Sequence, residues 1–313
     1  MELSIVTTLY RSEPFVAEFY QRMLAAAKKC SDDIEFIFVD DGSPDGSGAL
    51  VKAITSQDPR VTLVELSRNF GHHCAIMAGL SHARGEYVFL IDVDLEEQPE
   101  WIAEFWEELK GSDADMIFGV EERRKGSFFK RYSGALFYKL FNLLSETKIP
   151  ENLCTVRLMK RRFVRALLDI NDSNLFLAGI VSWAGFVHKA LPRSKNVRPM
   201  ASSYKLTRML SLFLNAITSF SSYPLKAIFF LGMSLSIIAG GFGAALIIER
   251  LLSPESMSVG WPSVMVSIWF LGGVIIAFVG VIGIYLSKIF VETKNRPLYI
   301  VREIYSQNKN QLS

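Results

Sequence analysis

The chain has 313 residues, of which 50% are hydrophobic, and a formal net charge of +2. This is enough material for one large domain or two ordinary ones, each with a full core. Cys30, Cys74 and Cys154 are odd in number and lack metal-ligand spacing, which argues against a disulfide framework or a zinc site. The opening MELSIVTTLY has a strand pattern with an acid at position 2, so it is not a secretory signal peptide.

The first 120 residues alternate strand and helix patterns. The expected strands are short and rich in Val, Ile and Phe: LSIVTTL, EFIFVD, VTLVEL, EYVFLIDVD and DMIFGV. Four helical patterns lie between them. The first has Phe15, Phe19 and Met23 on one face, the second follows SPDGS, the third runs from about 72 to 83, and the fourth runs from Pro99 to Lys110. Repeated β-α units predict an α/β fold with a mostly parallel sheet, which binds ligands at the carboxyl ends of its strands.

A basic segment follows this part of the chain. Twelve Lys or Arg residues and only two acids lie between Arg123 and Arg165, which predicts an anionic partner. Stretches 126–145 and 205–222 are also amphipathic, and either a packed core face or a position in a membrane interface explains that pattern. Because both stretches precede long apolar runs, lipid headgroups or a lipid phosphate are favoured over nucleic acid.

Two runs contain no charged side chain, 227–248 and 263–287. At about 1.5 Å per residue each is long enough to cross a bilayer core, so two transmembrane helices are predicted, with a pair of buried helices as the alternative. Lys and Arg flank the pair, whereas the connecting loop has one Arg and two Glu. Both termini are therefore expected in the cytoplasm. Glycines in both runs permit close helix packing, either within a hairpin or in a homo-oligomer.

Acidic side chains follow two of the expected strands. Asp92 and Asp94 end the fourth strand, and Asp40 and Asp41 end the second. In an extended strand residues two apart point the same way, so Asp92 and Asp94 are expected to converge, and such a pair needs a cation. Mg²⁺ or Mn²⁺, completing its shell with phosphate oxygens, fits that need, while a solvated turn is the ordinary alternative for Asp-x-Asp.

Several motifs in the same order resemble one known family: LSIVTTLYRSE, VDDGSPDGS, LSRNFGHHCAIMAGLSHARGEYVFLIDVDLEEQPE and KNRPLYIVRE. They resemble the family 2, GT-A-type glycosyltransferases, and more narrowly the bacterial polyprenyl-phosphate glycosyltransferases. The resemblance covers essentially the whole chain. It implies a Rossmann-like GT-A domain over 1–204, a juxtamembrane helix over 205–222, a transmembrane hairpin over 223–290 and a cytoplasmic tail over 291–313.

The resemblance also implies roles for individual residues. The nucleotide site would comprise the following residues: Thr8, Tyr10, Glu13, Val39, Asp41, Ser43, Arg123 and Lys205. Asp92 and Asp94 would hold the metal ion on the diphosphate, and Glu96 would either ligate the same ion or face the sugar. Arg157 would match an Arg in a Gly-Asp-Phe-Arg-Leu motif. By contrast, a capping or solvent role is favoured over metal binding for His72 and His73.

The chain departs from the family pattern at Thr155, where relatives have Asp two residues before that Arg. Since a phosphate monoester is largely anionic near pH 7, it can attack without a general base, which leaves the role of Thr155 open. Glu121 also replaces a common Arg, and SSYK at 202–205 replaces the order Ser-Lys-Tyr.

The implied activity is transfer of a sugar from a nucleotide sugar, expected to be UDP-linked, to undecaprenyl phosphate at the inner membrane of a bacterium. The product would be a lipid-linked sugar for O-antigen or cell-envelope modification. A processive polysaccharide synthase is an alternative, although the chain contains no Arg-Trp dipeptide. A non-catalytic membrane scaffold or lipid-translocation partner is the alternative from another class.

Overall fold

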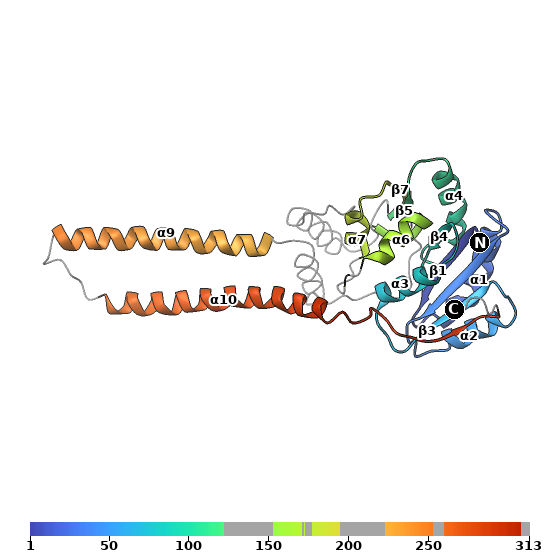
Figure 1. Ribbon diagram of the computed structural model, residues 1–313, viewed down its shortest axis with the longest axis horizontal. Helices are drawn as coiled ribbons and strands as arrows, with labels where there is room; N and C mark the ends of the chain where they lie inside the picture. Colours follow the sequence, from blue (N-terminus) through green and yellow to red (C-terminus); the bar gives the residue numbers. More distant parts are fainter. Residues whose placement is uncertain (122–152, 171, 173–176, 195–222, 253–259, 308–313) are drawn as a thin grey trace. The chain divides into compact units, whose positions relative to one another are not determined.

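The computed structural model describes residues 1–121, 153–170, 172, 177–194, 223–252 and 260–307 (Figure 1). The chain divides into two compact units. The first comprises Met1–Asn142, Thr147–Lys205 and Arg296–Ser313, and the second comprises Leu143–Glu146 and Leu206–Asn295. The predicted interfacial stretches 126–145 and 205–222 lie outside the described residues.

The described part of the first unit is built on one sheet in the order β7-β5-β6-β4-β1-β2-β3-β8. The strands are β1 (Leu3–Leu9), β2 (Ile34–Asp40), β3 (Val61–Leu66), β4 (Tyr87–Leu90), β5 (Met116–Glu121), β6 (Leu153–Lys160), β7 (His188–Arg193) and β8 (Val301–Tyr305). The pairs β1–β2, β1–β4, β2–β3 and β5–β7 are parallel, whereas β6 runs antiparallel to β4 and β5, and β8 antiparallel to β3. The mostly parallel α/β fold is thus confirmed. Segment 291–313, however, was expected to be a separate tail and instead contributes β8 to the sheet.

Helices cover both faces of this sheet. They are α1 (Glu13–Ala27), α2 (Ser47–Thr55), α3 (His72–His82), η1 (Pro99–Trp101), α4 (Ile102–Lys110), α6 (Arg161–Asp169) and α7 (Leu177–Trp183). On one face of the sheet, α1, α2 and α4 pack in a single hydrophobic core, and Phe19, Phe36 and Phe38 are among its fully buried side chains. The other face carries α3 against β1 and β2, with α6 beside it. Because both faces of the sheet are covered, side chains on both sides of the central strands are buried, and the sequence of these strands is nearly continuously apolar.

Gly79 lets α3 lie unusually close to the sheet. A Cβ built at this position would lie 2.4 Å from Val6 Cγ1 and 3.0 Å from Val39 Cγ2, closer than packed carbon atoms can approach. The absence of a side chain therefore sets the height of α3 above β1 and β2. That height fixes where the first residue of the helix, His72, lies relative to Thr8.

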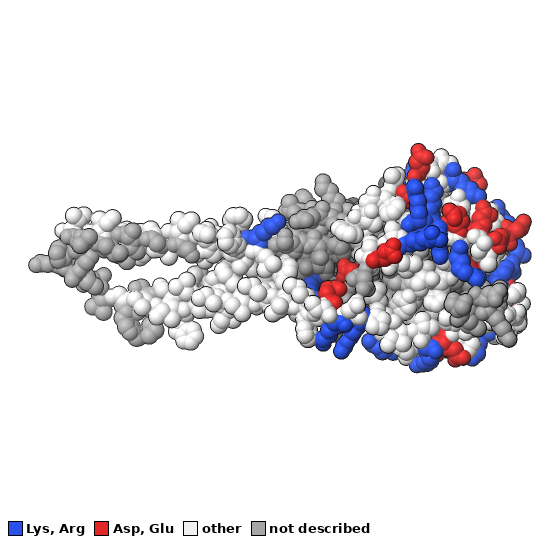
Figure 2. All heavy atoms as spheres, in the orientation of Figure 1, with Lys and Arg blue, Asp and Glu red and all other residues white. Residues whose placement is uncertain are grey.

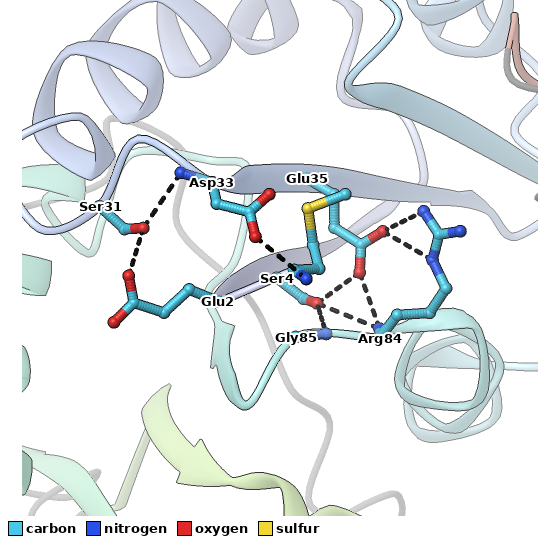
Figure 3. A network of polar contacts seen from close by, with 8 residues as sticks. Glu2, Ser4, Ser31, Asp33, Glu35, Arg84 and Gly85 are labelled. Atoms are coloured by element: carbon cyan, nitrogen blue, oxygen red, sulfur yellow. Dashed lines mark hydrogen bonds and ion pairs between the residues drawn. The ribbon is translucent and has the colours of Figure 1, made fainter.

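A buried carboxylate ties β1, β2 and the loop before β4 together (Figure 3). Glu35 is 2% exposed and accepts hydrogen bonds from Ser4 Oγ at 2.6 Å, from the Arg84 backbone N–H at 2.7 Å, and from Arg84 Nη2 at 2.8 Å. Ser4 Oγ in turn accepts the Gly85 N–H at 2.7 Å. Because every group has a partner, this network stabilises the amino-terminal end of the strands rather than penalising it.

The second unit contains α9 (Tyr223–Leu252) and α10 (Trp261–Thr293). In the face shown by Figure 2, Lys, Arg, Asp and Glu gather on the first unit, and most of the described surface of these two helices is uncharged. Among the described residues, one segment is long and apolar enough to cross a membrane, Ser267–Thr293, with a mean hydropathy of 2.4 and 0% buried. The sequence predicts two such spans; for α9, only the shorter apolar stretch Leu225–Ala239 is found.

Candidate active site

The candidate residues gather at one edge of the sheet. In parallel β1, β2 and β4 the carboxyl ends lie on the same side, and Thr8, Asp41 and Asp92 occur at or just after those ends. The antiparallel strand β6 begins at this edge, because its Arg157 pairs with Leu90, the last residue of β4. This is the edge at which open α/β sheets bind ligands.

Asp41 organises the loop between β3 and α3. Its Oδ1 accepts the Phe70 N–H at 2.7 Å, its Oδ2 accepts the Gly71 N–H at 3.0 Å, and Asn69 Nδ2 donates to its backbone carbonyl at 3.1 Å. Burial raises the pKa of this carboxyl, and the two amide hydrogen bonds partly offset the rise. Each carboxylate oxygen can accept a further bond, so Asp41 can shape the loop and still meet a ligand.

Glu13 and Ser43, both expected in the nucleotide site, hold the start of α2. Glu13 Oε2 accepts the Gly46 N–H at 2.9 Å, and Ser43 Oγ accepts the Arg11 N–H at 2.8 Å. Asp45 links them: its Oδ2 accepts the Glu13 N–H at 3.1 Å and its Oδ1 accepts the Ser43 hydroxyl at 2.6 Å. Burial by itself raises the pKa of Asp45, but bonds from the Ser43 and Ser47 hydroxyls and from the Glu13 and Ser47 backbone N–H groups lower it to about 2. The structure thus gives Glu13 and Ser43 a supporting position beside the edge.

His72 connects two of the strand ends. Its Nδ1 lies 3.1 Å from Thr8 Oγ1 and its Nε2 lies 3.5 Å from Asp92 Oδ1. Desolvation and then the charge of Arg157 lower the pKa of His72, although Asp41, Glu97 and Asp94 act in the opposite direction. A capping or solvent role was expected for this residue. The signal that could have found it is its position at the start of the helix that follows the third strand, directly above the carboxyl edge.

The acidic motif lies in a turn and not in a strand. Strand β4 ends at Leu90, Leu95 has a positive φ of 58°, and the Glu96 N–H donates to Asp94 Oδ1 at 3.1 Å. The strand therefore ends before both acids, and binding of one metal ion by Asp92 and Asp94 together stays a prediction. In the described part of the chain no group of three or more His, Cys, Asp or Glu side chains is arranged to hold a metal ion.

The chemistry of this edge nevertheless suits a hard divalent cation. Asp41, Glu97 and Asp94 each oppose the lowering of the pKa of His72, so this end of the sheet carries several carboxylates. Oxygen donors of this kind bind Mg²⁺ or Mn²⁺, and two protein carboxylates are enough when phosphate oxygens supply other ligands. Asp92 and Asp94 fit that arrangement.

Thr155 and Arg157 lie on β6 beside a buried acid that was not expected in the site. Glu97 is 0% exposed, and its Oε1 accepts the Thr155 N–H at 2.9 Å. Arg157 is also buried and donates from Nε to the Thr155 carbonyl at 2.9 Å and from Nη2 to the Cys154 carbonyl at 3.3 Å. Burial lowers the pKa of Arg157, with the charges of Glu97 and Asp92 opposing that shift. Arg157 thus donates to the backbone of its own strand, and a role for it in the reaction stays a prediction.

The remaining expected residues divide into three cases. Tyr10 is 47% exposed at the end of β1, with the Arg11 guanidinium 5.6 Å from its ring centroid. Val39 is fully buried under α3, so its side chain forms core and does not line a surface. Arg123 and Lys205 lie outside the described residues.

Comparison with known proteins agrees with this architecture. The sequence profile described as glycosyl transferase family 2 matches residues 4–168. A Mycobacterium tuberculosis protein whose name gives it as a glycosyltransferase is 44% identical over 98% of this chain and 90% of its own length. The SfII prophage-derived bactoprenol glucosyl transferase of Shigella flexneri is 35% identical over 98% of this chain and 100% of its own.

The fold is a mixed α/β, GT-A-like fold with a mostly parallel sheet. The chain belongs to glycosyl transferase family 2, and it is a glycosyltransferase. A solved mannosyltransferase of Pyrobaculum calidifontis, in complex with GDP-Man and Mn²⁺, is 18% identical over 94% of this chain and 86% of its own, with a TM-score of 0.49. That likeness is too low to assign a ligand to this chain.

Proposed function

We propose that this protein transfers glucose from a nucleotide sugar, UDP-glucose in the first instance, to undecaprenyl phosphate. The observation that carries the proposal is the near full-length similarity to a protein named as a bactoprenol glucosyl transferase, at 35% identity. The gathering of Thr8, Asp41, His72 and Asp92 at one sheet edge supports a nucleotide diphosphate site there.

The proposed reaction is a single inverting displacement. An oxygen of the acceptor phosphate forms a bond to the anomeric carbon while the bond from that carbon to the diphosphate oxygen breaks, and UDP leaves with the electron pair. The acceptor is already anionic near pH 7, so Thr155 need not remove a proton. In-line attack from the opposite side of the carbon inverts it.

The residues at the edge would share the work of binding and orientation. The loop organised by Asp41 would hold the nucleoside. Asp92 and Asp94 would hold Mg²⁺ or Mn²⁺, which when bound supplies positive charge to the leaving diphosphate. His72 would hold the side chains of Asp92 and Thr8 at fixed positions relative to each other. Arg157 and Glu97 would fix the backbone of Thr155 on β6.

We further propose a place in the bacterial inner membrane. In this arrangement α9 and α10 form a two-span hairpin, the first unit and both termini are cytoplasmic, and the loop around Glu255 faces outward, as the excess of Lys and Arg at both flanks supports. A homo-oligomer packed through the glycine-rich helix faces is part of the same proposal. Labelling of single cysteines in intact cells tests the topology: a cysteine at position 256 should react with an impermeant reagent and one at position 310 should not.

The activity is tested with purified protein in detergent, undecaprenyl phosphate and a panel of labelled nucleotide sugars. Glucose should appear in a lipid-linked product, and excess chelator or Asp94→Ala should abolish it. Asp113→Ala is the matched control, because Asp113 is exposed and precedes β5 at the opposite end of the sheet. Nucleotide binding without transfer of any sugar would instead support the non-catalytic scaffold.

A further inference from the structure

The strand that follows the membrane helices has an irregularity at one position. Strand β8 pairs with β3 so that Glu65 lies opposite Glu303 and Leu66 lies opposite Val301, which leaves Arg302 as the extra residue of a β-bulge. Bulges of this kind turn a side chain out of its regular direction and are common beside active sites. Here the bulge directs Arg302 toward the end of β3.

Arg302 joins the end of β3 to the loop that follows it. Its Nη1 lies 2.7 Å from Glu65 Oε1 and its Nη2 donates to the Ser67 carbonyl at 2.8 Å. The Ser67 N–H donates to the Ile300 carbonyl at 2.9 Å, so both backbone groups of Ser67 are held by the segment that precedes or forms β8. The chain therefore fixes the first residue of the β3–α3 loop from a position more than two hundred residues away.

The same loop carries the amides that bind Asp41. Ser67 is followed within four residues by Phe70 and Gly71, whose N–H groups donate to the two oxygens of that carboxylate. The loop also packs tightly on the turn after β2, since a Cβ at Gly42 would lie 2.7 Å from the backbone of Arg68 and Asn69. A shift at Ser67 must therefore reach the Asp41 carboxylate.

Further contacts anchor the segment that carries Arg302. The Tyr299 hydroxyl lies 2.9 Å from Ser81 Oγ near the end of α3, and Lys52 Nζ of α2 lies 3.7 Å above the ring centroid of Tyr305. These contacts on both sides of Arg302 hold its backbone in place. Its guanidinium can then act as a fixed support, even though the side chain is 58% exposed.

We propose that Arg302 is a positioning residue for the donor site: through Ser67 it holds the Ser67–Gly71 loop against Asp41 and so sets the affinity for the nucleoside diphosphate. This inference rests on the proposed function for the identity of the ligand, but the loop contact it invokes does not. Strand β8 would then help to hold the loop of the nucleotide site in place.

The test uses the full-length protein in detergent and two readouts, amide hydrogen exchange at Phe70 and Gly71 and titration with UDP in the presence of Mn²⁺. Arg302→Ala should speed exchange of these two amides and raise the dissociation constant for UDP about five- to tenfold, the range expected for loss of one charge-assisted hydrogen bond at a partly exposed site. The same variant should raise KM for the nucleotide sugar and leave kcat within about twofold. Arg302→Lys should recover part of the affinity.

Glu303→Gln is the matched control, because Glu303 lies on the same strand and accepts a bond only from Tyr305 among the hydrogen bonds described for it. It should leave both readouts at the wild-type level. Unchanged exchange in Arg302→Ala would overturn the inference, and so would faster exchange with unchanged UDP affinity. If wild-type protein also fails to bind UDP, the proposed function is wrong, and the exchange at Phe70 and Gly71 still decides whether Arg302 holds the loop.

Discussion

Replacement of Asp45 by Asn should lower the free energy of unfolding at pH 7 by about 1–2 kcal/mol. In the native protein this carboxylate accepts the hydroxyls of Ser43 and Ser47 and the N–H of Glu13, and these bonds hold its pKa at about 2 against an ordinary value of 3.8. A difference of that size corresponds to about 2.4 kcal/mol, and solvent screening of a partly exposed group reduces it.

The pH dependence follows from the direction of the shift. A carboxyl whose pKa is lower in the folded state stabilises the protein fully above its unfolded pKa, and loses that contribution as the pH falls through the folded value. The stability difference between wild type and Asp45→Asn should therefore be largest above about pH 5 and fall to about half by pH 3.

Urea unfolding of the full chain in detergent, followed by tryptophan fluorescence at a series of pH values, measures this difference directly. Equal stability of the two proteins at pH 7 would refute the reasoning. A gap that stays constant down to pH 3 would also refute it, because the loss would then come from the poor fit of the amide and not from the lost charge.

Substitutions at four other positions test separate parts of the structure. Glu35→Gln should cost about 2–3 kcal/mol in the same unfolding assay, because the buried carboxylate loses its charge-assisted hydrogen bonds from Arg84, and a loss below about 0.5 kcal/mol would contradict this. Gly79→Ala should cost about 1–3 kcal/mol by overpacking Val6, and should slow turnover as α3 rises from the sheet; wild-type stability would show that the helix moves freely. Arg157→Met should lower stability by about 3 kcal/mol instead of raising KM for one substrate alone, which steady-state kinetics and thermal melts distinguish. Thr155→Ala should reduce kcat by less than about tenfold and Thr155→Asp should not raise it, whereas a large gain in Thr155→Asp would mean that a general base had been missing.

The central sheet could be predicted because its strands are nearly continuous apolar runs with acids and turns at their ends. Residues 3–9, 34–40 and 61–66 are buried almost without interruption, so local pattern and tertiary structure agree. The short strand β8 could not be predicted in the same way. Val301–Tyr305 carries two charged residues in five, and it is a strand only because the unpaired edge of β3 accepts it.

The location of the candidate site could be predicted from the sequence, but the contacts of its residues could not. Topology alone puts Asp41 and Asp92 at one edge, and the structure has them there. Their partners depend on backbone turns that residue spacing does not encode. The strand ends at Leu90 and the chain turns at Asp94, and the Asp41 carboxylate binds amides that come from a different loop, which only the packed structure brings into reach.

The place of β8 at the far end of the chain has a consequence for biosynthesis. Arg302 lies 237 positions after its partner Glu65, and at about 5–20 residues per second roughly 12–47 s of translation separate the two. During that interval the edge of β3 lacks its final neighbour while the apolar segments of α9 and α10 emerge. An open strand edge next to nascent apolar helices invites wrong pairing, and the sheet can close only after both helices have been synthesised. A ribosome stalled before position 301 should therefore hold a first domain that proteases cleave near β3 and α3, and release of the full chain should remove that sensitivity.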